Sequence, residues 1–166
     1  KYPKLQKALH VNTLNTVSPL EFSVPANSTI EFTIIPQKIS KENVILTDAN
    51  GADAAYAYIE SSSIHEQSGK FKFFNPFKSL LDEDFPYYTG LPITIYLNTG
   101  AANGGLNGID IKATTYVDNE YLEVSDTVMF NSTNLKFGPS SGMQNFINES
   151  GSFYLQNFKY YDETLD

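Results

Sequence analysis

The sequence predicts an all-β protein: an antiparallel β-sandwich or jelly roll, formed as a single domain with little helix. Three observations support this prediction. Short runs alternate apolar and polar residues, which is the period of half-buried strands. Clusters of Asn, Gly, Pro and Ser separate these runs at short intervals, as turns do. The chain has 166 residues, 41% of them hydrophobic, and no Cys, which is enough for one core without disulfides.

The first two predicted strands flank a Pro-Ala-Asn-Ser turn. The alternating runs Leu20–Val24 and Ile30–Ile34 predict a hairpin, with Phe32 facing the core. A helical turn is predicted over 77–84, because Asn75-Pro76 can begin it and Pro86 ends it. Further strands are predicted at 44–46, 55–59, 70–73, 93–97, 109–117, 122–124, 128–130 and 153–160.

An N-terminal arm, residues 1–17, precedes the sandwich domain of residues 18–166. The arm carries four apolar side chains and no clear turn: Leu5, Leu9, Val11 and Leu14. Such a segment can pair with the open sheet edge of a neighbouring subunit, which predicts a homo-oligomer held by an intersubunit strand. The alternative is that the arm pairs within its own domain.

Charge and composition argue against several kinds of partner. The net charge is −8, with 11 Lys and no Arg. Because Arg supplies the two-pronged hydrogen bonding that phosphates and guanine edges favour, we expect no nucleic-acid partner. No apolar run approaches the roughly 18 residues of a membrane span. The chain opens on Lys1 rather than Met, which we interpret as removal of a leader peptide and which favours an extracellular or cell-surface location.

The sequence contains no recognisable catalytic motif. His10 and His65 are the only histidines, and neither belongs to a nucleophile or metal motif. We therefore expect that the protein is not an enzyme. A carboxylate pair for glycoside hydrolysis stays open as an alternative, since such a pair is recognisable only in three dimensions.

One loop has features of a calcium site. Asp48, Asn50 and Asp53 place oxygen side chains around a Gly, and Ca²⁺ prefers oxygen ligands presented by a tight turn. The loop departs from an EF-hand, since its Gly comes early and no Glu falls at the twelfth position. Asp110 and the segment 118–120 could add ligands. The alternative is an ordinary Asn-Gly turn.

The aromatic residues suggest a glycan platform. They form 14% of the chain, with 11 Tyr and 12 Phe. Tyr56 and Tyr58 share one face of a predicted strand and could stack on sugar rings, as could the segments 85–88 and 160–161. The alternative is that Phe fills the core while Tyr covers its rim. Three sequons permit N-glycosylation without arguing for it, at Asn27, Asn131 and Asn148.

These observations favour a non-enzymatic extracellular β-sandwich with a structural or adhesive role. We expect such a subunit to self-assemble on a cell surface or in a filament, with Ca²⁺ as a candidate stabilising ion. A carbohydrate-binding module is the first alternative, and a virion or phage-fibre jelly-roll protein is the second.

Overall fold

The protein is built from strands. The computed structural model describes residues 9–12, 21–38, 42–48, 56–61, 68–74, 86–99, 107–130, 133–138 and 152–163. These ranges hold twelve strands and no helix. The strands are β1 (Leu9–Asn12), β2 (Glu21–Ser23), β3 (Thr29–Lys38), β4 (Glu42–Asp48), β5 (Tyr56–Ser61), β6 (Ser68–Phe74), β7 (Pro86–Tyr88), β8 (Ile93–Thr99), β9 (Asn107–Val117), β10 (Glu120–Phe130), β11 (Asn134–Phe137) and β12 (Ser152–Tyr161).

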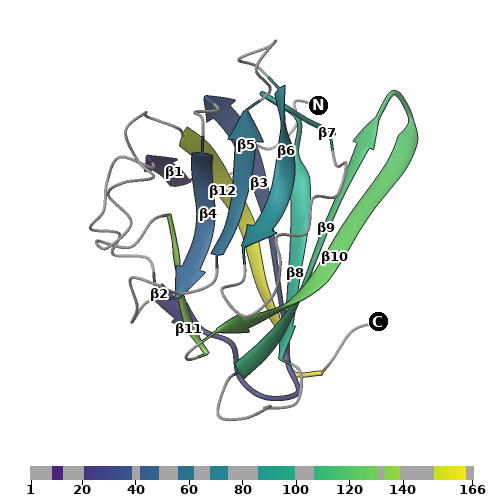
Figure 1. Ribbon diagram of the computed structural model, residues 1–166. Coiled ribbons are helices and arrows are strands. Elements are labelled where there is room, and N and C mark those ends of the chain that lie inside the picture. The colour runs from purple at the N-terminus through teal and green to yellow at the C-terminus, as the bar shows by residue number, and fades with distance from the viewer. Residues whose placement is uncertain are drawn as a thin grey trace, which may run out of the picture.

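The strands form two six-stranded sheets. The first sheet has the order β1-β12-β3-β8-β9-β10, and the second has the order β2-β11-β4-β5-β6-β7. Every pairing in both sheets is antiparallel. The two sheets form two layers, with β4, β5 and β6 in front of β12, β3 and β8 (Figure 1). The prediction of an all-β antiparallel sandwich is therefore confirmed.

The core lies between the two sheets and follows the predicted alternation. Along β8, for example, Ile93, Ile95 and Leu97 are buried while the residues between them are partly exposed. Phe32 is 0% exposed, so the prediction that it faces the core is confirmed. The first sheet supplies most of the buried aliphatic residues, and Ile45, Leu46, Leu135 and Phe137 face them from the second.

The predicted hairpin of Leu20–Val24 with Ile30–Ile34 is wrong. Strand β2 belongs to the second sheet and pairs with β11, whereas β3 belongs to the first and pairs with β8 and β12. The turn between them crosses from one layer to the other. Asn27 adopts a left-handed φ of 56° there, and the buried Ser28 hydroxyl donates to the Pro25 carbonyl oxygen at 2.5 Å. The hairpin prediction failed because Pro and Asn favour turns of both kinds, those that join neighbouring strands and those that cross between layers.

Four residues of the N-terminal arm pair within their own chain. Strand β1 lies antiparallel to β12, with Leu9 opposite Leu155 and Asn12 opposite Ser152. The alternative of pairing within the domain therefore holds for residues 9–12. The rest of the arm and the predicted helical turn at 77–84 lie outside the described residues, so an intersubunit role for the arm stays a prediction. In the ranges given above, no helix is long and apolar enough to span a membrane.

Candidate functional site

An open pocket lies where the connection from β7 to β8 approaches the tip of the β9–β10 hairpin. Its volume is about 430 Å³, within the usual range for small-ligand sites. Seven of the described residues line it: Tyr88, Thr89, Gly90, Leu91, Tyr116, Val117 and Asp118. We call it the tyrosine pocket, because two of its walls are exposed tyrosine rings, Tyr88 at 45% and Tyr116 at 64%.

A tight turn fixes the Tyr88 side of the pocket. The Leu91 N–H donates to the Tyr88 carbonyl oxygen at 3.2 Å, and Gly90 between them has a φ of +81°. A left-handed third residue is the mark of a type II turn and accounts for the Gly. The Gly90 N–H also donates to the Pro36 carbonyl oxygen at 2.7 Å. This bond ties the turn to β3.

The opposite side of the pocket is the tip of the β9–β10 hairpin. Asp118 and Asn119 both adopt left-handed φ angles, 51° and 63°, as the two central residues of a type I′ turn do. This turn places Tyr116 directly opposite Tyr121. Their rings pack edge to face, with centroids 5.4 Å apart. Tyr121 therefore extends the aromatic surface of the pocket onto β10.

The Tyr121 hydroxyl is held by an acidic neighbour. It donates to Oε2 of Glu123 at 2.9 Å. Partial burial of the phenol, the hydrogen bond to Glu123 and the negative charge of that carboxylate raise the pKa of Tyr121 above its usual 10.0. Tyr121 is thus an uncharged hydrogen-bonding group over the whole physiological range.

This raised pKa predicts a late-ionising phenol in an alkaline titration. Because the folded protein holds the Tyr121 proton more tightly than the unfolded chain, this group supports the fold below about pH 10 and ceases to do so as the pH rises through its folded pKa. We expect Tyr121→Phe to remove one late component from the ultraviolet absorbance titration of tyrosinate. Tyr88→Phe, as the control, should leave that component in place. A late component that persists in Tyr121→Phe, beyond the contribution of Tyr96, would contradict the assignment.

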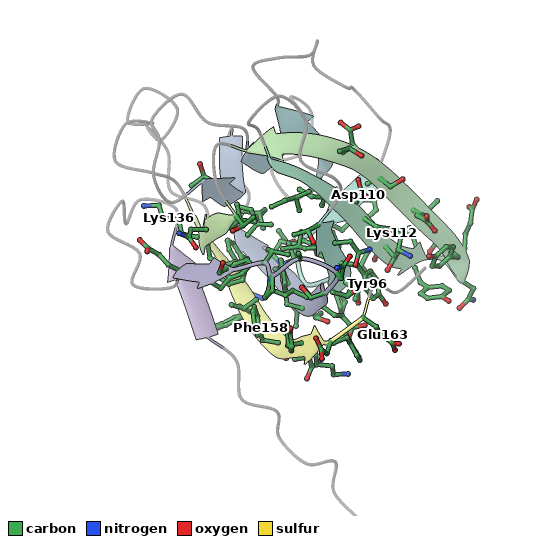
Figure 2. The ribbon with its side chains drawn as sticks, turned by 90° about the horizontal axis from the view of Figure 1, so that it is seen from below. Tyr96, Asp110, Lys112, Lys136, Phe158 and Glu163 are labelled. Carbon is green, nitrogen blue, oxygen red and sulfur yellow. The ribbon has the colours of Figure 1, made fainter. Side chains whose placement is uncertain are left out.

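A second polar cluster crosses the outer face of the first sheet. Four residues in register on adjacent strands form a row: Lys159, Glu31, Tyr96 and Lys112. Glu31 Oε2 lies 3.5 Å from Lys159 Nζ and accepts a hydrogen bond from the Tyr161 hydroxyl at 3.3 Å. Burial, followed by its hydrogen bond to Glu31, raises the pKa of Tyr96. Lys112 Nζ lies 4.9 Å from the centre of the Tyr96 ring, and Figure 2 shows the two side chains together. The polar groups of this row thus contact one another or the neighbouring Tyr161.

The proposed calcium ligands are only partly described. Asp48 ends β4, with its backbone opposite Leu135, while Asn50 and Asp53 lie outside the described residues. Of the other candidate calcium ligands, Asp118 and Asn119 form the hairpin turn, and Asp110 lies within β9 and accepts a hydrogen bond from Thr127 at 2.5 Å. Among the described residues, no three acidic or His side chains are grouped as a metal site. Calcium binding stays a prediction.

The predicted glycan platform on β5 is also only partly described. Tyr56 and Tyr58 lie two residues apart on β5, opposite Phe74 and Lys72 of β6, so they share one face of that strand. The positions of their side chains lie outside the described residues. Of the sequons, Asn27 is exposed on its turn, and its N–H donates to Thr99 Oγ1 at 3.1 Å. Asn131 and Asn148 lie outside the described ranges.

The sequence contained a signal for the tyrosine pocket that our sequence reasoning did not use. In Tyr116-Val-Asp-Asn-Glu-Tyr121, two turn-forming residues stand between alternating runs. A two-residue hairpin turn there would pair Tyr116 with Tyr121. Our sequence interpretation treats this Asp-Asn pair only as a source of calcium ligands. Tyr88, on the other wall, belongs to the segment 85–88 that is a sequence candidate for stacking on sugar rings, but its place beside Tyr116 depends on contacts between segments that are distant in sequence.

Comparison with known proteins gives structural likeness alone. No family model and no curated protein matches the sequence. Among solved structures, a marine alginate lyase from Aplysia kurodai shares 10% identity at a TM-score of 0.45, covering 84% of this chain and 71% of that one. A heptameric pentraxin from Limulus polyphemus shares 12% identity at a TM-score of 0.45, covering 99% and 74%. The binding domain of botulinum neurotoxin serotype C1 shares 11% identity at a TM-score of 0.42, covering 96% and 45%.

Proposed function

We propose that this β-sandwich is a carbohydrate-binding protein whose binding site is the tyrosine pocket. One observation carries the proposal: Tyr88 and Tyr116 are exposed on two sides of an open pocket whose backbone is fixed by two tight turns. Large exposed aromatic rings grouped together on a soluble protein often mark a binding site. The proposal is for binding, without a chemical step.

The chemistry of the pocket suits a sugar ring. A tyrosine presents an apolar face and a polar hydroxyl, and a pyranose likewise has C–H groups on its faces and hydroxyls around its rim. Asp118 adds a carboxylate at the edge of the pocket, which can accept hydrogen bonds from sugar hydroxyls. The shape is also suitable, because an open pocket admits one or two residues of a longer chain.

Charge favours neutral glycans over acidic ones. Asp118 lies in the pocket wall, and Glu120 and Glu123 follow it on β10. Among the residues that the structure describes, no Lys lines the pocket, and the whole chain carries a net charge of −8. A uronic acid or sulfated sugar would therefore approach like charge and find no cation among the described lining residues. We expect neutral hexose polymers to bind and their carboxylated counterparts not to bind.

Binding can be tested on an array of neutral and acidic oligosaccharides, followed by calorimetry on the ligands found. We expect Tyr116→Ala to weaken binding about tenfold or more, because it removes the most exposed ring among the described residues, while Tyr116→Phe keeps most of the affinity. The matched control is Tyr160→Ala. Tyr160 is 52% exposed and pairs with Ile30, towards the opposite end of the first sheet.

Two outcomes would contradict the proposal. One is that no glycan on the array binds at millimolar concentration. The other is that Tyr116→Ala binds a discovered glycan as tightly as the unaltered protein does, which would place the site elsewhere. Because the chain has no Trp, ligand-induced changes in tyrosine fluorescence offer a second readout.

A role as a self-assembling surface subunit is the second candidate. The observation that favours it is a long strand at one edge of the first sheet, β10. This role does not exclude glycan binding, since adhesive assemblies present many copies of a weak site.

A further inference from the structure

The two sheets end in edge strands of very different length. Three of them are short: β1 has four residues, and β2 and β7 have three each. The fourth, β10, has eleven residues and pairs only with β9 among the described strands. A long edge strand offers a row of backbone donors and acceptors to any extended segment, and natural proteins usually shorten or cover such edges. Strand β10 is therefore the edge best suited to accept a further strand.

The register of the hairpin shows which backbone groups face the open edge. In a hairpin with a two-residue turn, the flanking residues Val117 and Glu120 form a hydrogen-bonded pair. Along β10 the hydrogen-bonded positions then alternate, and the residues between them direct their N–H and C=O groups away from β9. These edge-facing residues are Tyr121, Glu123, Ser125, Thr127 and Met129.

The β10 edge strand carries acidic residues at a regular spacing. Glu120, Glu123 and Asp126 occur every third residue along β10, and the strand has no Lys. Pairing β10 with a second β10 would bring these three acids close to three more, which opposes a symmetric contact. A basic segment is the favoured partner.

The chain itself contains a segment with the complementary spacing. Lys1, Lys4 and Lys7 also occur every third residue, and the first acid in the sequence is Glu21. Residues 1–8 thus hold three of the 11 lysines in an otherwise acidic chain. These residues immediately precede β1.

One antiparallel register sets all three lysines opposite the three acids. Placing Lys4 opposite Glu123 also sets Lys1 opposite Asp126 and Lys7 opposite Glu120. Leu5 then faces Leu122, and Pro3 faces Val124. Because Val124 bonds to β9, Pro3 occupies a position where its missing N–H is not needed. Opposite charges and apolar pairs across strands both stabilise a sheet.

The partner must come from a second copy of the chain. Strands β1 and β10 are the opposite edges of one sheet, separated by five interstrand spacings of about 4.8 Å, or about 24 Å. Residues 1–8 span at most about 27 Å when extended. Crossing their own sheet would use that whole length and leave nothing to pair with β10. A neighbouring molecule has no such constraint.

We propose that the β10 edge binds residues 1–8 of a second copy as an additional antiparallel strand, in the register that sets Lys4 opposite Glu123. This contact is head-to-tail, so each copy both donates an arm and accepts one. Head-to-tail contacts generate rings or filaments. The contact leaves β1 paired with β12 in its own chain.

Charge exchange in the full-length protein tests the proposal by sedimentation and light scattering at low salt. We expect concentration-dependent association, weakened by added salt because salt screens the ion pairs. Lys4→Glu and Glu123→Lys should each weaken association about tenfold, since each places like charges opposite one another. The double variant Lys4→Glu with Glu123→Lys should recover most of that loss.

The matched controls make the same change in charge elsewhere. Lys159→Glu changes net charge as Lys4→Glu does, and Asp162→Lys approximates Glu123→Lys; both sites lie on β12 or just beyond it. Neither should weaken association as the edge variants do. A protein that stays monomeric at low salt overturns the proposal, and so does association that survives Lys4→Glu or is not recovered in the double variant.

Crosslinking tests the register independently, since the native chain has no Cys. A mixture of Tyr2→Cys and Ser125→Cys proteins should form a disulfide-linked dimer under mild oxidation, because these positions face each other in the proposed register. Tyr2→Cys mixed with Tyr121→Cys should not. If the second mixture crosslinks instead, the strand runs parallel to β10 and the proposed register is overturned.

Discussion

Phe32→Ala is expected to lower the free energy of unfolding by about 3–5 kcal/mol, the range for truncating a buried Phe. The ring of Phe32 is completely buried and joins the two sheets. It meets the Phe137 ring of β11 edge to face, with centroids 5.0 Å apart, and stacks on Phe158 of β12 at 6.2 Å. The truncation therefore removes apolar contacts and leaves a cavity between the layers.

Denaturant unfolding followed by far-ultraviolet circular dichroism measures this loss. Phe32→Leu, which keeps most of the volume, should cost clearly less than the Ala variant. Thr94→Ala, on the partly exposed side of β8, should change stability by less than about 0.5 kcal/mol. A loss below about 1 kcal/mol in Phe32→Ala would mean that the two sheets do not depend on this aromatic contact.

Replacing Lys136 by Met is expected to stabilise the protein by on the order of 1 kcal/mol at pH 7. Lys136 is 7% exposed on β11, between β2 and β4, with Glu21 opposite it. Burial lowers the pKa of its ammonium group below the usual 10.5, and the charge of Glu21 offsets only part of this effect. Met keeps the shape of the side chain and removes the charge that is costly to bury.

The cost of burying the Lys136 charge also predicts how the free energy of unfolding changes with pH. Between the lowered folded pKa of Lys136 and about 10.5, the unfolded chain holds this proton more than the folded protein does. The contribution of Lys136 to the free energy of unfolding therefore rises with pH in that interval, and below it the full cost of the buried charge is present. The rise should be absent from Lys136→Met.

Thermal melts of both proteins from pH 7 to 11 measure this difference. The control is Lys159→Met, whose side chain is 56% exposed in its ion pair with Glu31 and whose removal should matter little. A Lys136→Met protein that is less stable at pH 7 would show that the favourable interactions of the ammonium group, such as that with Glu21, outweigh the cost of burying it.

The fold class was predictable because the sandwich imposes a period of two on almost every strand. Ile30, Phe32 and Ile34 are buried, and the residues that alternate with them face outward or are less buried, so their pattern is visible without coordinates. The pairing of the strands with one another was less predictable. The short strands β1 and β2 pair with strands more than 100 residues away, and β7 pairs with the preceding strand β6 across the connection 75–85. Nothing within three or four residues encodes that choice.

One irregularity in β12 shows the limit of reasoning from periodicity. The sequence predicts an uninterrupted strand at 153–160, but the register with β3 shifts between Gln156 and Lys159. Asn157 adopts a left-handed φ of 57° at this bulge, and the ring of Phe158 packs near those of Phe22, Phe32 and Phe137. An Asn tolerates this conformation, but the same Asn would also be compatible with an exposed position in a regular strand.

The candidate site was less predictable than the fold. The tyrosine pocket joins a turn after β7 in one sheet to the tip of a hairpin in the other. Tyrosine occurs both at the rim of a core and in binding sites. Composition alone therefore could not show whether the site lies at Tyr56, Tyr58, Tyr88 or Tyr116. Tyr88 and Tyr116 are distinguished by the folded structure, in which both line the same pocket.

The position of β12 between β1 and β3 has a consequence for how the protein is made. The N-terminal strand β1 pairs with a strand near the C-terminal end of the sequence, and β3 is paired on one side by that same strand. A ribosome delivers the chain from its N-terminus at about 5–20 residues per second. Until β12 emerges, β1 lacks its partner and one edge of β3 is open. The first sheet is therefore completed only once β12 has been synthesised. Before that point the nascent chain exposes unpaired strand edges, which chaperones can bind and which can also pair wrongly with other chains.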